Sequence, residues 1–186
     1  MTEMIRCFVA FPLPAAVKNA IRRLQSDLKP SMPKIRWTRP DNLHLTLRFL
    51  GDQPEDSLEK LAETVLSVGD SSHCFQLTFS GLDAFPSWHR GRVLWLGLAQ
   101  PELVSQLHQK LSDGLLQLGI PEEPRPFHPH LTIGRCRQPM ALPQRPAGGR
   151  SRTVAEFRVD RLVLYQSRLT LQGARHTELC SARLRT

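Results

Sequence analysis

The sequence predicts an α+β protein in which antiparallel sheets carry helices on their outer faces. Several short segments alternate apolar and polar residues, which is typical of strands, and three longer segments repeat apolar residues at helical spacing. Strands and helices occur in blocks, and several neighbouring strands are close enough in the chain to form hairpins. This order favours antiparallel sheets over the parallel sheet that a regular strand–helix alternation would build.

Three amphipathic helices are expected because apolar residues recur every three or four positions, at about 15–28, 56–68 and 102–118. Pro30 and Pro33 end the first helix, and Gly119 stops the third. Strands are expected at Arg6–Leu13, Ile35–Thr38, Leu43–Leu50, Cys74–Leu82, Arg92–Leu98, His130–Cys136, Val154–Val159, Leu162–Ser167 and His176–Leu184. The Gly51-Asp52 pair is expected to stop the third strand, and Gln138–Arg152, rich in Pro, Gly and Arg, is the best candidate for a loop.

The composition is that of a globular protein with a net positive charge. Of the 186 residues, 40% are hydrophobic, which is enough to bury a core in one compact domain. There are 25 Lys and Arg residues against 17 Asp and Glu, a formal net charge of +8 that attracts polyanions. Most of the cations are arginine, which suits paired contacts to phosphate oxygens, although a GC-rich genome would also raise the arginine content.

Cysteine usage and the N-terminus indicate the compartment. No segment reaches the roughly 18 apolar residues that a membrane helix needs, and the first residues lack the pattern of a signal peptide. The four cysteines, Cys7, Cys74, Cys136 and Cys180, stand singly with no C-x-x-C pair. We therefore expect four reduced thiols, no zinc site, and a cytoplasmic protein.

One short motif occurs twice. His44-Leu45-Thr46-Leu47 and His130-Leu131-Thr132-Ile133 both follow the pattern His-x-Thr-x, and the two histidines are 86 positions apart (130 − 44). Each copy lies in a predicted strand, where successive side chains point to opposite faces. The His and Thr of each copy therefore share one face, and the apolar residues share the other. If the two strands lie side by side or across a groove, both His–Thr pairs converge on one pocket.

Such a pocket has the groups that hydrolysis of a strained cyclic phosphodiester requires. Two imidazoles with ordinary pKa values of about 6.5 can hold opposite protonation states near neutral pH. One imidazole then activates water as a base, and the other protonates the leaving oxygen from the opposite side of phosphorus. Threonine hydroxyls donate to the phosphate oxygens and stabilise their negative charge.

Two other interpretations of the motif compete with catalysis. A single His-x-Thr on a strand usually marks a half-buried face, but two copies in matching contexts favour a function. Metal binding is the other common use of histidine, and it needs further ligands. No Asp, Glu or Cys sits at ligand spacing within either motif, so we predict no metal and no cofactor.

Two longer segments resemble the signatures of a known family. Ile35–Gly51 reads IRWTRPDNLHLTLRFLG, and Arg125–Arg135 reads RPFHPHLTIGR. Together they resemble the paired signatures of the two-histidine phosphoesterase superfamily and, within it, the bacterial RNA 2′,3′-cyclic phosphodiesterases, also called 2′-5′ RNA ligases. A weaker likeness extends along almost the whole chain, through Arg6–Pro14, Arg92–Gly97 and Leu164–Leu169.

The resemblance implies a bilobal α+β domain over residues 1–186, with two antiparallel sheets and outer helices around a central cleft of pseudo-twofold symmetry. It implies hydrolysis of RNA 2′,3′-cyclic phosphate ends to 2′-phosphomonoesters. It assigns His44 as the proton donor and His130 as the proton acceptor, with Thr46 and Thr132 holding the phosphate. The expected partner is an RNA end, with tRNA fragments as one candidate source, and the expected state is a monomer.

The chain departs from the family pattern at one position. Gly173-Ala174-Arg175-His176 has a histidine where a tyrosine is common in the family after the Tyr-x-Ser segment. A solvated position on the last strand is the favoured interpretation of His176, and a third histidine in the cleft is the alternative.

Several residues near the motifs are secondary candidates. Arg135 is a candidate phosphate ligand, although strict alternation places it on the apolar face of its strand. Alternation also places Arg48 on the face of His44 and Thr46, where a substrate contact and a rim ion pair are equally expected, and it places Phe49 on the buried face. Phe127 is a candidate for stacking on an RNA base, with core packing as its alternative. A rim of arginines facing RNA is one interpretation of the loop candidate, from Arg137, Arg145, Arg150 and Arg152.

Three functions remain open from the sequence. The first is the cyclic phosphodiesterase. The second is end-joining of RNA through a 2′-5′ linkage in the same site, which differs only in whether a 5′-hydroxyl or water attacks. The third is a non-catalytic RNA-binding module, which predicts degraded motifs, whereas all four motif residues are present. The sequence therefore favours a hydrolase.

Overall fold

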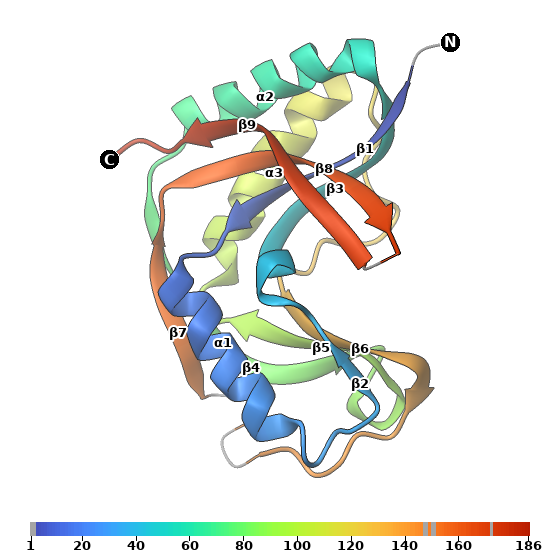
Figure 1. Cartoon of the computed structure of the whole chain (residues 1–186). Coiled ribbons are helices and arrows are strands. Elements are labelled where there is room, and N and C mark those ends of the chain that lie inside the picture. The colour runs from blue at the N-terminus through green and yellow to red at the C-terminus, as the bar shows by residue number, and fades with distance from the viewer. Residues whose placement is uncertain (1–2, 147–148, 150–151, 172) are drawn as a thin grey trace.

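The computed structural model describes residues 3–186 except 147–148, 150–151 and 172 (Figure 1). In chain order its elements are β1 (Met4–Pro12), α1 (Ala15–Leu28), β2 (Ile35–Trp37), β3 (His44–Pro54), α2 (Leu58–Asp70), β4 (Phe75–Phe85), β5 (Gly91–Leu98), α3 (Pro101–Gln117), β6 (Leu131–Met140), β7 (Thr153–Val159), β8 (Arg161–Thr170) and β9 (Gly173–Arg183). Short 3-10 turns lie at Pro40–Asn42, Glu55–Ser57 and Trp88–Arg90.

The strands form two antiparallel sheets, one in each half of the molecule (Figure 1). The first sheet has the strand order β3-β1-β8-β9, and the second has the order β2-β6-β5-β4-β7. The motif strands β3 and β6 therefore lie in different sheets, and they come close to each other where the two halves meet. The predicted bilobal α+β fold is confirmed.

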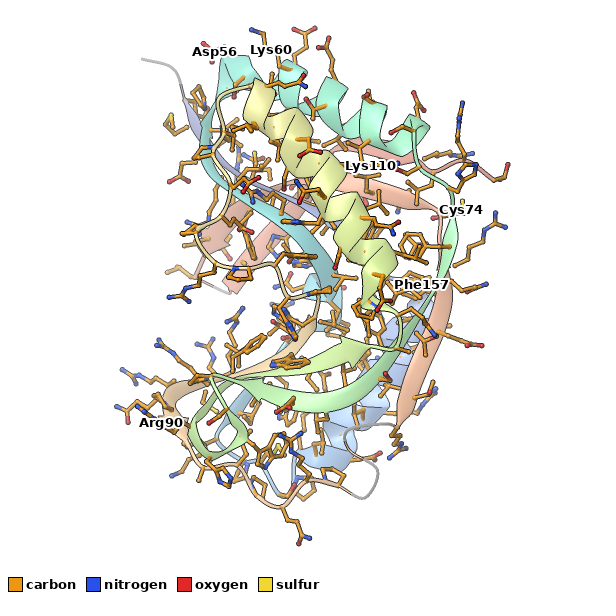
Figure 2. All side chains as sticks on the ribbon, turned by 180° about the vertical axis from the view of Figure 1, so that it is seen from behind. Asp56, Lys60, Cys74, Arg90, Lys110 and Phe157 are labelled. Carbon is orange, nitrogen blue, oxygen red and sulfur yellow. The ribbon has the colours of Figure 1, made fainter. Side chains whose placement is uncertain are left out.

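Helices α1 and α3 each pack in the half of the molecule opposite to that of the strand that precedes them. Helix α1 follows β1 of the first sheet but packs against β7 of the second sheet. Helix α3 follows β5 of the second sheet but packs with α2 over the first sheet (Figure 2). Lys110 on α3 links the two helices, since its Nζ donates to the Ser71 carbonyl at the end of α2 at 2.9 Å. Each half of the molecule is thus built from both halves of the sequence.

A buried glutamine ties α1 to the second motif strand. Gln25 is 4% exposed, and its Nε2 donates to the carbonyl oxygens of Thr38 and Ile133, each at 3.0 Å. The Ile133 carbonyl also accepts from the Thr38 N–H. Because a buried carbonyl without a donor is costly, Gln25 fixes α1 against the strand that carries His130.

Replacing Gln25 by Leu is expected to lower the free energy of unfolding by about 1–3 kcal/mol, because two buried carbonyl oxygens lose a donor. Urea unfolding followed by circular dichroism measures the change. Gln106, which is exposed on α3, provides the matched control, and its replacement by Leu is expected to change stability by less than about 0.5 kcal/mol. Equal stability of the two variants would contradict the role of Gln25.

The predicted C-terminal ends of both motif strands are wrong. Strand β3 does not stop at Gly51 but continues to Pro54, still paired with β1. Gly51 has a φ of 70°, a backbone conformation that glycine adopts without strain, and it lies at a register shift of the β1–β3 ladder. Strand β6 runs on to Met140 and pairs with Gly91, so the irregular segment begins later than the predicted Gln138.

The apolar residues of both motifs lie in the core, as predicted. Leu45, Leu47, Leu131 and Ile133 are at most 1% exposed. All four cysteines are unbonded thiols. No helix in the described part of the chain combines the length and the apolar character that a membrane crossing requires.

Candidate active site

The two motif strands contribute side chains to one cavity where the halves meet. Thr46 from β3 and His130, the residue before β6, both line a cavity of about 700 Å³. Its wall is largely apolar, with three phenylalanine rings, Phe49, Phe85 and Phe127, and it also carries Arg92 and Glu123. We call this space the central cavity. It lies between the two sheets, as the doubled motif predicts.

Both motif strands carry a β-bulge at the same motif position. In the β1–β3 ladder, Ala10 pairs with Thr46 and Val9 with Arg48, so Leu47 has no partner in the register. In the β5–β6 ladder, Trp95 pairs with Thr132 and Leu94 with Gly134, so Ile133 has none. The last residue of each His-x-Thr-x motif is therefore the extra residue of a bulge.

The bulge inverts the alternation for the residues that directly follow it. On β3 it turns Arg48 into the interior, where it is 2% exposed, and it turns Phe49 outward, where it is 57% exposed and lines the central cavity. On β6 it buries Gly134 and leaves Arg135 exposed. The predictions from strict alternation were wrong for Arg48, Phe49 and Arg135, because that rule assumes a regular strand.

His44 belongs to a cluster of rings with one member from each strand of the first sheet. Its ring centroid lies 4.7 Å from Phe8 on β1, 6.4 Å from Tyr165 on β8 and 5.1 Å from His176 on β9. The ring of His44 also forms a hydrogen bond with the backbone of Asn42. These contacts hold the imidazole in a defined orientation.

His130 has a corresponding cluster in the second sheet. Its ring lies 5.0 Å from Phe85 and 6.0 Å from Trp95, and both of these rings also contact His128. The Nδ1 of His130 is 2.7 Å from the His128 carbonyl oxygen, which can only accept a hydrogen bond. The neutral ring therefore carries its proton on Nδ1 and leaves Nε2 as a free base.

The pKa of each motif histidine is lower than usual. Burial and, to a smaller extent, the neighbouring His176 lower the pKa of His44 to about 4, although the hydrogen bond with Asn42 opposes both effects. Burial also lowers the pKa of His130, and the hydrogen bond to the His128 carbonyl opposes this shift. A bound phosphate adds negative charge, which favours the protonated form of a nearby imidazole. Phosphate binding therefore reverses part of the lowering of the histidine pKa.

Cations lie near His130. The charge of Arg135 contributes to the lowered pKa of His130. Burial and, second, the charge of Arg92, which lines the central cavity, lower the pKa of Arg135. Two guanidinium groups therefore share the neighbourhood of the second motif, which is a typical environment for a phosphate group. Arg135 was a sequence candidate, whereas Arg92 was not.

Phe127 lies on the wall of the central cavity and stacks on His108 of α3 with ring centroids 4.0 Å apart and an interplanar angle of 1°. This stacking holds the segment that leads to His130.

Arg48 provides further contacts that hold the same segment. The Arg48 guanidinium donates to the Pro121 carbonyl and lies 3.6 Å from the Glu123 carboxylate. Arg48 was expected either to contact the substrate or to form an ion pair on the rim. The ion pair is present, but the Arg48 side chain that forms it is buried.

The sequence analysis missed or misplaced several residues of the site. Phe49 and Phe85 were not candidates, and His176 was assigned to solvent, although it is half-buried and contacts the ring of His44. Arg145 does not belong to an RNA-facing rim, because it pairs with Asp83 at 2.6 Å and lies over the ring of Trp88. Arg150 of the same predicted rim lies outside the described residues.

Comparisons with known proteins agree with this geometry. A family model described as the 2′-5′ RNA ligase superfamily matches residues 11–170. The RNA 2′,3′-cyclic phosphodiesterase of Escherichia coli K12 is 34% identical over 183 residues, which cover 96% of each chain. The protein of the same name from Geobacillus stearothermophilus is 34% identical over 164 residues, which are 87% of this chain and 52% of that one, so the chain spans about half the length of this relative.

A solved structure shares the fold over its whole length. The crystal structure of E. coli LigT complexed with 3′-AMP matches with a TM-score of 0.83 and 29% sequence identity, covering 99% of this chain and 100% of that chain. Two antiparallel sheets, each presenting a His-x-Thr strand where the halves meet, define a two-histidine phosphoesterase. The match of the family model over most of the chain shows that it belongs to the 2′-5′ RNA ligase superfamily.

Proposed function

We propose that this protein hydrolyses RNA 2′,3′-cyclic phosphate ends to 2′-phosphomonoesters. The observation that carries the proposal is that Thr46 of the first motif and His130 of the second line the same cavity between the sheets. The activity named for the relatives, which are RNA 2′,3′-cyclic phosphodiesterases, supports it.

In the proposed reaction His130 acts as the base. Its Nε2 is left as a free acceptor because Nδ1 is bound to the His128 carbonyl. It takes a proton from water, whose oxygen then attacks phosphorus. His44, in its protonated form, gives a proton to the departing 3′ oxygen on the opposite side. The bond from phosphorus to the 2′ oxygen stays intact, and the product is a 2′-phosphomonoester.

Charge on the phosphate is stabilised by neutral donors and by arginines. Thr46 and Thr132 share the faces of the two histidines on their strands, and their hydroxyls donate to the non-bridging oxygens in our proposal. Arg135 is the proposed cationic ligand, and Arg92 adds a second positive charge on the cavity wall. Phe127, with Phe49 and Phe85 on the same wall, offers a surface for stacking a nucleobase.

The test is phosphorus NMR of the product from a dinucleotide that ends in a 2′,3′-cyclic phosphate, incubated with enzyme and a chelator. The expected signal is that of a 2′-phosphomonoester, formed at the same rate with and without the chelator. A 3′-phosphomonoester, or no turnover, would contradict the proposal. A parallel sample with an added 5′-hydroxyl RNA reports end-joining, since a 2′-5′ phosphodiester has its own resonance.

The cellular setting is part of the proposal. We propose a monomer that works in the cytoplasm on RNA ends, with tRNA fragments as one candidate source. The net charge of +8 supports an RNA substrate, and four free thiols support a reducing compartment. Sedimentation of the purified protein tests the oligomeric state, and sequencing of the cellular RNAs that keep cyclic ends in its absence identifies the substrate.

A further inference from the structure

The cluster around His44 contains a second imidazole. The rings of His44 and His176 meet edge to face, with centroids 5.1 Å apart and an angle of 87°, and both contact Phe8. His176 comes from β9, at the opposite edge of the first sheet from β3, and the ring of Phe8 on β1 lies against both. Two ionisable rings therefore share one largely apolar environment.

The two rings differ in how they are held. His44 is fixed by its hydrogen bond with the backbone of Asn42. The Nδ1 of His176 is buried and has no hydrogen-bond partner among the described residues. His176 can therefore change its protonation state without breaking a hydrogen bond of that nitrogen to the described part of the fold.

Two positive charges about 5 Å apart in this environment repel each other strongly. At an effective dielectric constant of about 20, the repulsion weakens binding of the second proton on the order of a hundredfold. The other ionisable groups around the pair come from four segments of the chain. They are Lys18 on α1, Arg39 and Asp41 before β3, Tyr165 on β8, and Arg175 and Glu178 on β9.

These surrounding groups do not favour a second proton. Lys18 lowers the pKa of His44, Arg39 and Arg175 face the single carboxylate of Asp41, and Glu178 is paired with Arg161. Burial raises the pKa of Tyr165 to about 12, so its hydroxyl stays neutral. The pair consequently holds one proton or none over the range in which an imidazole titrates.

We propose that His176 is a third ionisable residue of the site, which shares a single proton with His44 and competes for it in the free enzyme. This inference rests on the proposed function, in which His44 must be protonated. When the proton is on His176, His44 is unprotonated and cannot act as the acid. A bound phosphate draws the proton to His44, which leaves His176 neutral, and His44 then passes it to the leaving 3′ oxygen.

Competition between His44 and His176 for a proton changes the pH dependence of kcat/KM, which depends on the ionisation of groups in the free enzyme. Above the pKa of both rings, the fraction of protonated His44 depends only on its own proton affinity, so His176 has no effect. Below the pKa of His176, the wild type places the proton on His176 and its rate stops rising. Without His176, kcat/KM continues to rise as the pH falls. At still lower pH, protonation of His130 lowers kcat/KM equally in the wild type and in the variant.

The experiment compares wild type with His176→Phe, which keeps a ring against Phe8, and with His176→Gln, which keeps a polar group. The substrate is a dinucleotide ending in a cyclic phosphate, measured from about pH 5 to 9. Both variants are expected to match the wild type at alkaline pH and to exceed it on the order of tenfold near pH 5. His89→Phe, at an exposed histidine outside the site, is expected to leave the profile unchanged.

A purely structural His176 predicts a different result, in which both variants are slower at every pH with the same profile shape. That result would overturn the proposal. Proton NMR of the imidazole C–H signals tests the pair without turnover. In the wild type the His44 and His176 signals are expected to shift with one common midpoint, each by only part of the shift of a fully protonated ring, whereas in His176→Phe the His44 signal shifts fully. Separate midpoints in the wild type would overturn the shared proton while leaving the proposed hydrolysis untouched.

Discussion

Replacing either His44 or His130 by Ala is expected to lower kcat by about 10²- to 10⁴-fold, the range that acid–base groups contribute to catalysis. Affinity for the RNA end is expected to change little, because Thr46, Arg92 and the phenylalanine rings of the cavity wall remain. Single-turnover kinetics on an RNA with a cyclic phosphate end measures the rate, and binding of the product to each variant measures the affinity.

His89 provides the matched control for these substitutions. It is exposed and immediately precedes Arg90, which Figure 2 labels in the lower half of the molecule. His89→Ala is expected to keep the wild-type rate. Turnover of His44→Ala at the wild-type rate would exclude the proposed mechanism.

A substrate with sulfur in place of the 3′ oxygen separates the roles of the two histidines. A thiolate is a better leaving group than an alkoxide and needs no proton to depart, because a thiol has a pKa of about 8.5. His44→Ala is therefore expected to regain most of its lost rate on this substrate, whereas His130→Ala is not. The opposite pattern would show that His130 is the acid and His44 is the base.

Replacing Arg48 by Met is expected to lower the free energy of unfolding by about 2 kcal/mol and kcat by roughly tenfold. Methionine fills much of the same space, but the Pro121 carbonyl loses its charged donor and the Glu123 carboxylate loses its partner. The segment from Pro121 to His130 then loses its contacts with β3, and a small displacement of His130 slows the reaction. Urea unfolding and kcat measure the two effects.

The control for Arg48 is an exposed ion pair. Arg161 on β8 lies 3.3 Å from Glu178, with both side chains well exposed to solvent. Arg161→Met is expected to change stability by less than about 1 kcal/mol, because solvent screens such pairs. If Arg48→Met were equally mild, the buried guanidinium would not hold the segment as we infer.

The sequence predicted the elements that local patterns determine. The helix predicted at 15–28 has those bounds, because the spacing of its apolar residues and the prolines around it act within the segment. The pairing of Thr46 and His130 in one cavity was expected from the doubled motif. That expectation rested on a repeat in the chain, since no local property of either strand shows where the other lies.

The errors come from interactions between distant strands. A bulge depends on the register with the partner strand, so neither Leu47 nor Ile133 shows it locally. The faces of Arg48, Phe49 and Arg135 follow from those bulges. His176 was assigned to solvent because its contact with His44 joins residues 132 positions apart (176 − 44), and a single histidine on a strand carries no signal for that contact.

The exchange of helices between the halves has a consequence for the integrity of the protein. A fragment that ended after β5 would have α1 but neither β6 nor β7, and it would lack α3, which covers the first sheet. Neither lobe is continuous in the sequence, so neither can be produced as a separate folding unit by cutting the chain once. Because the two lobes share segments of the chain, unfolding of one lobe disrupts the other. We therefore expect the whole chain to unfold in a single cooperative step.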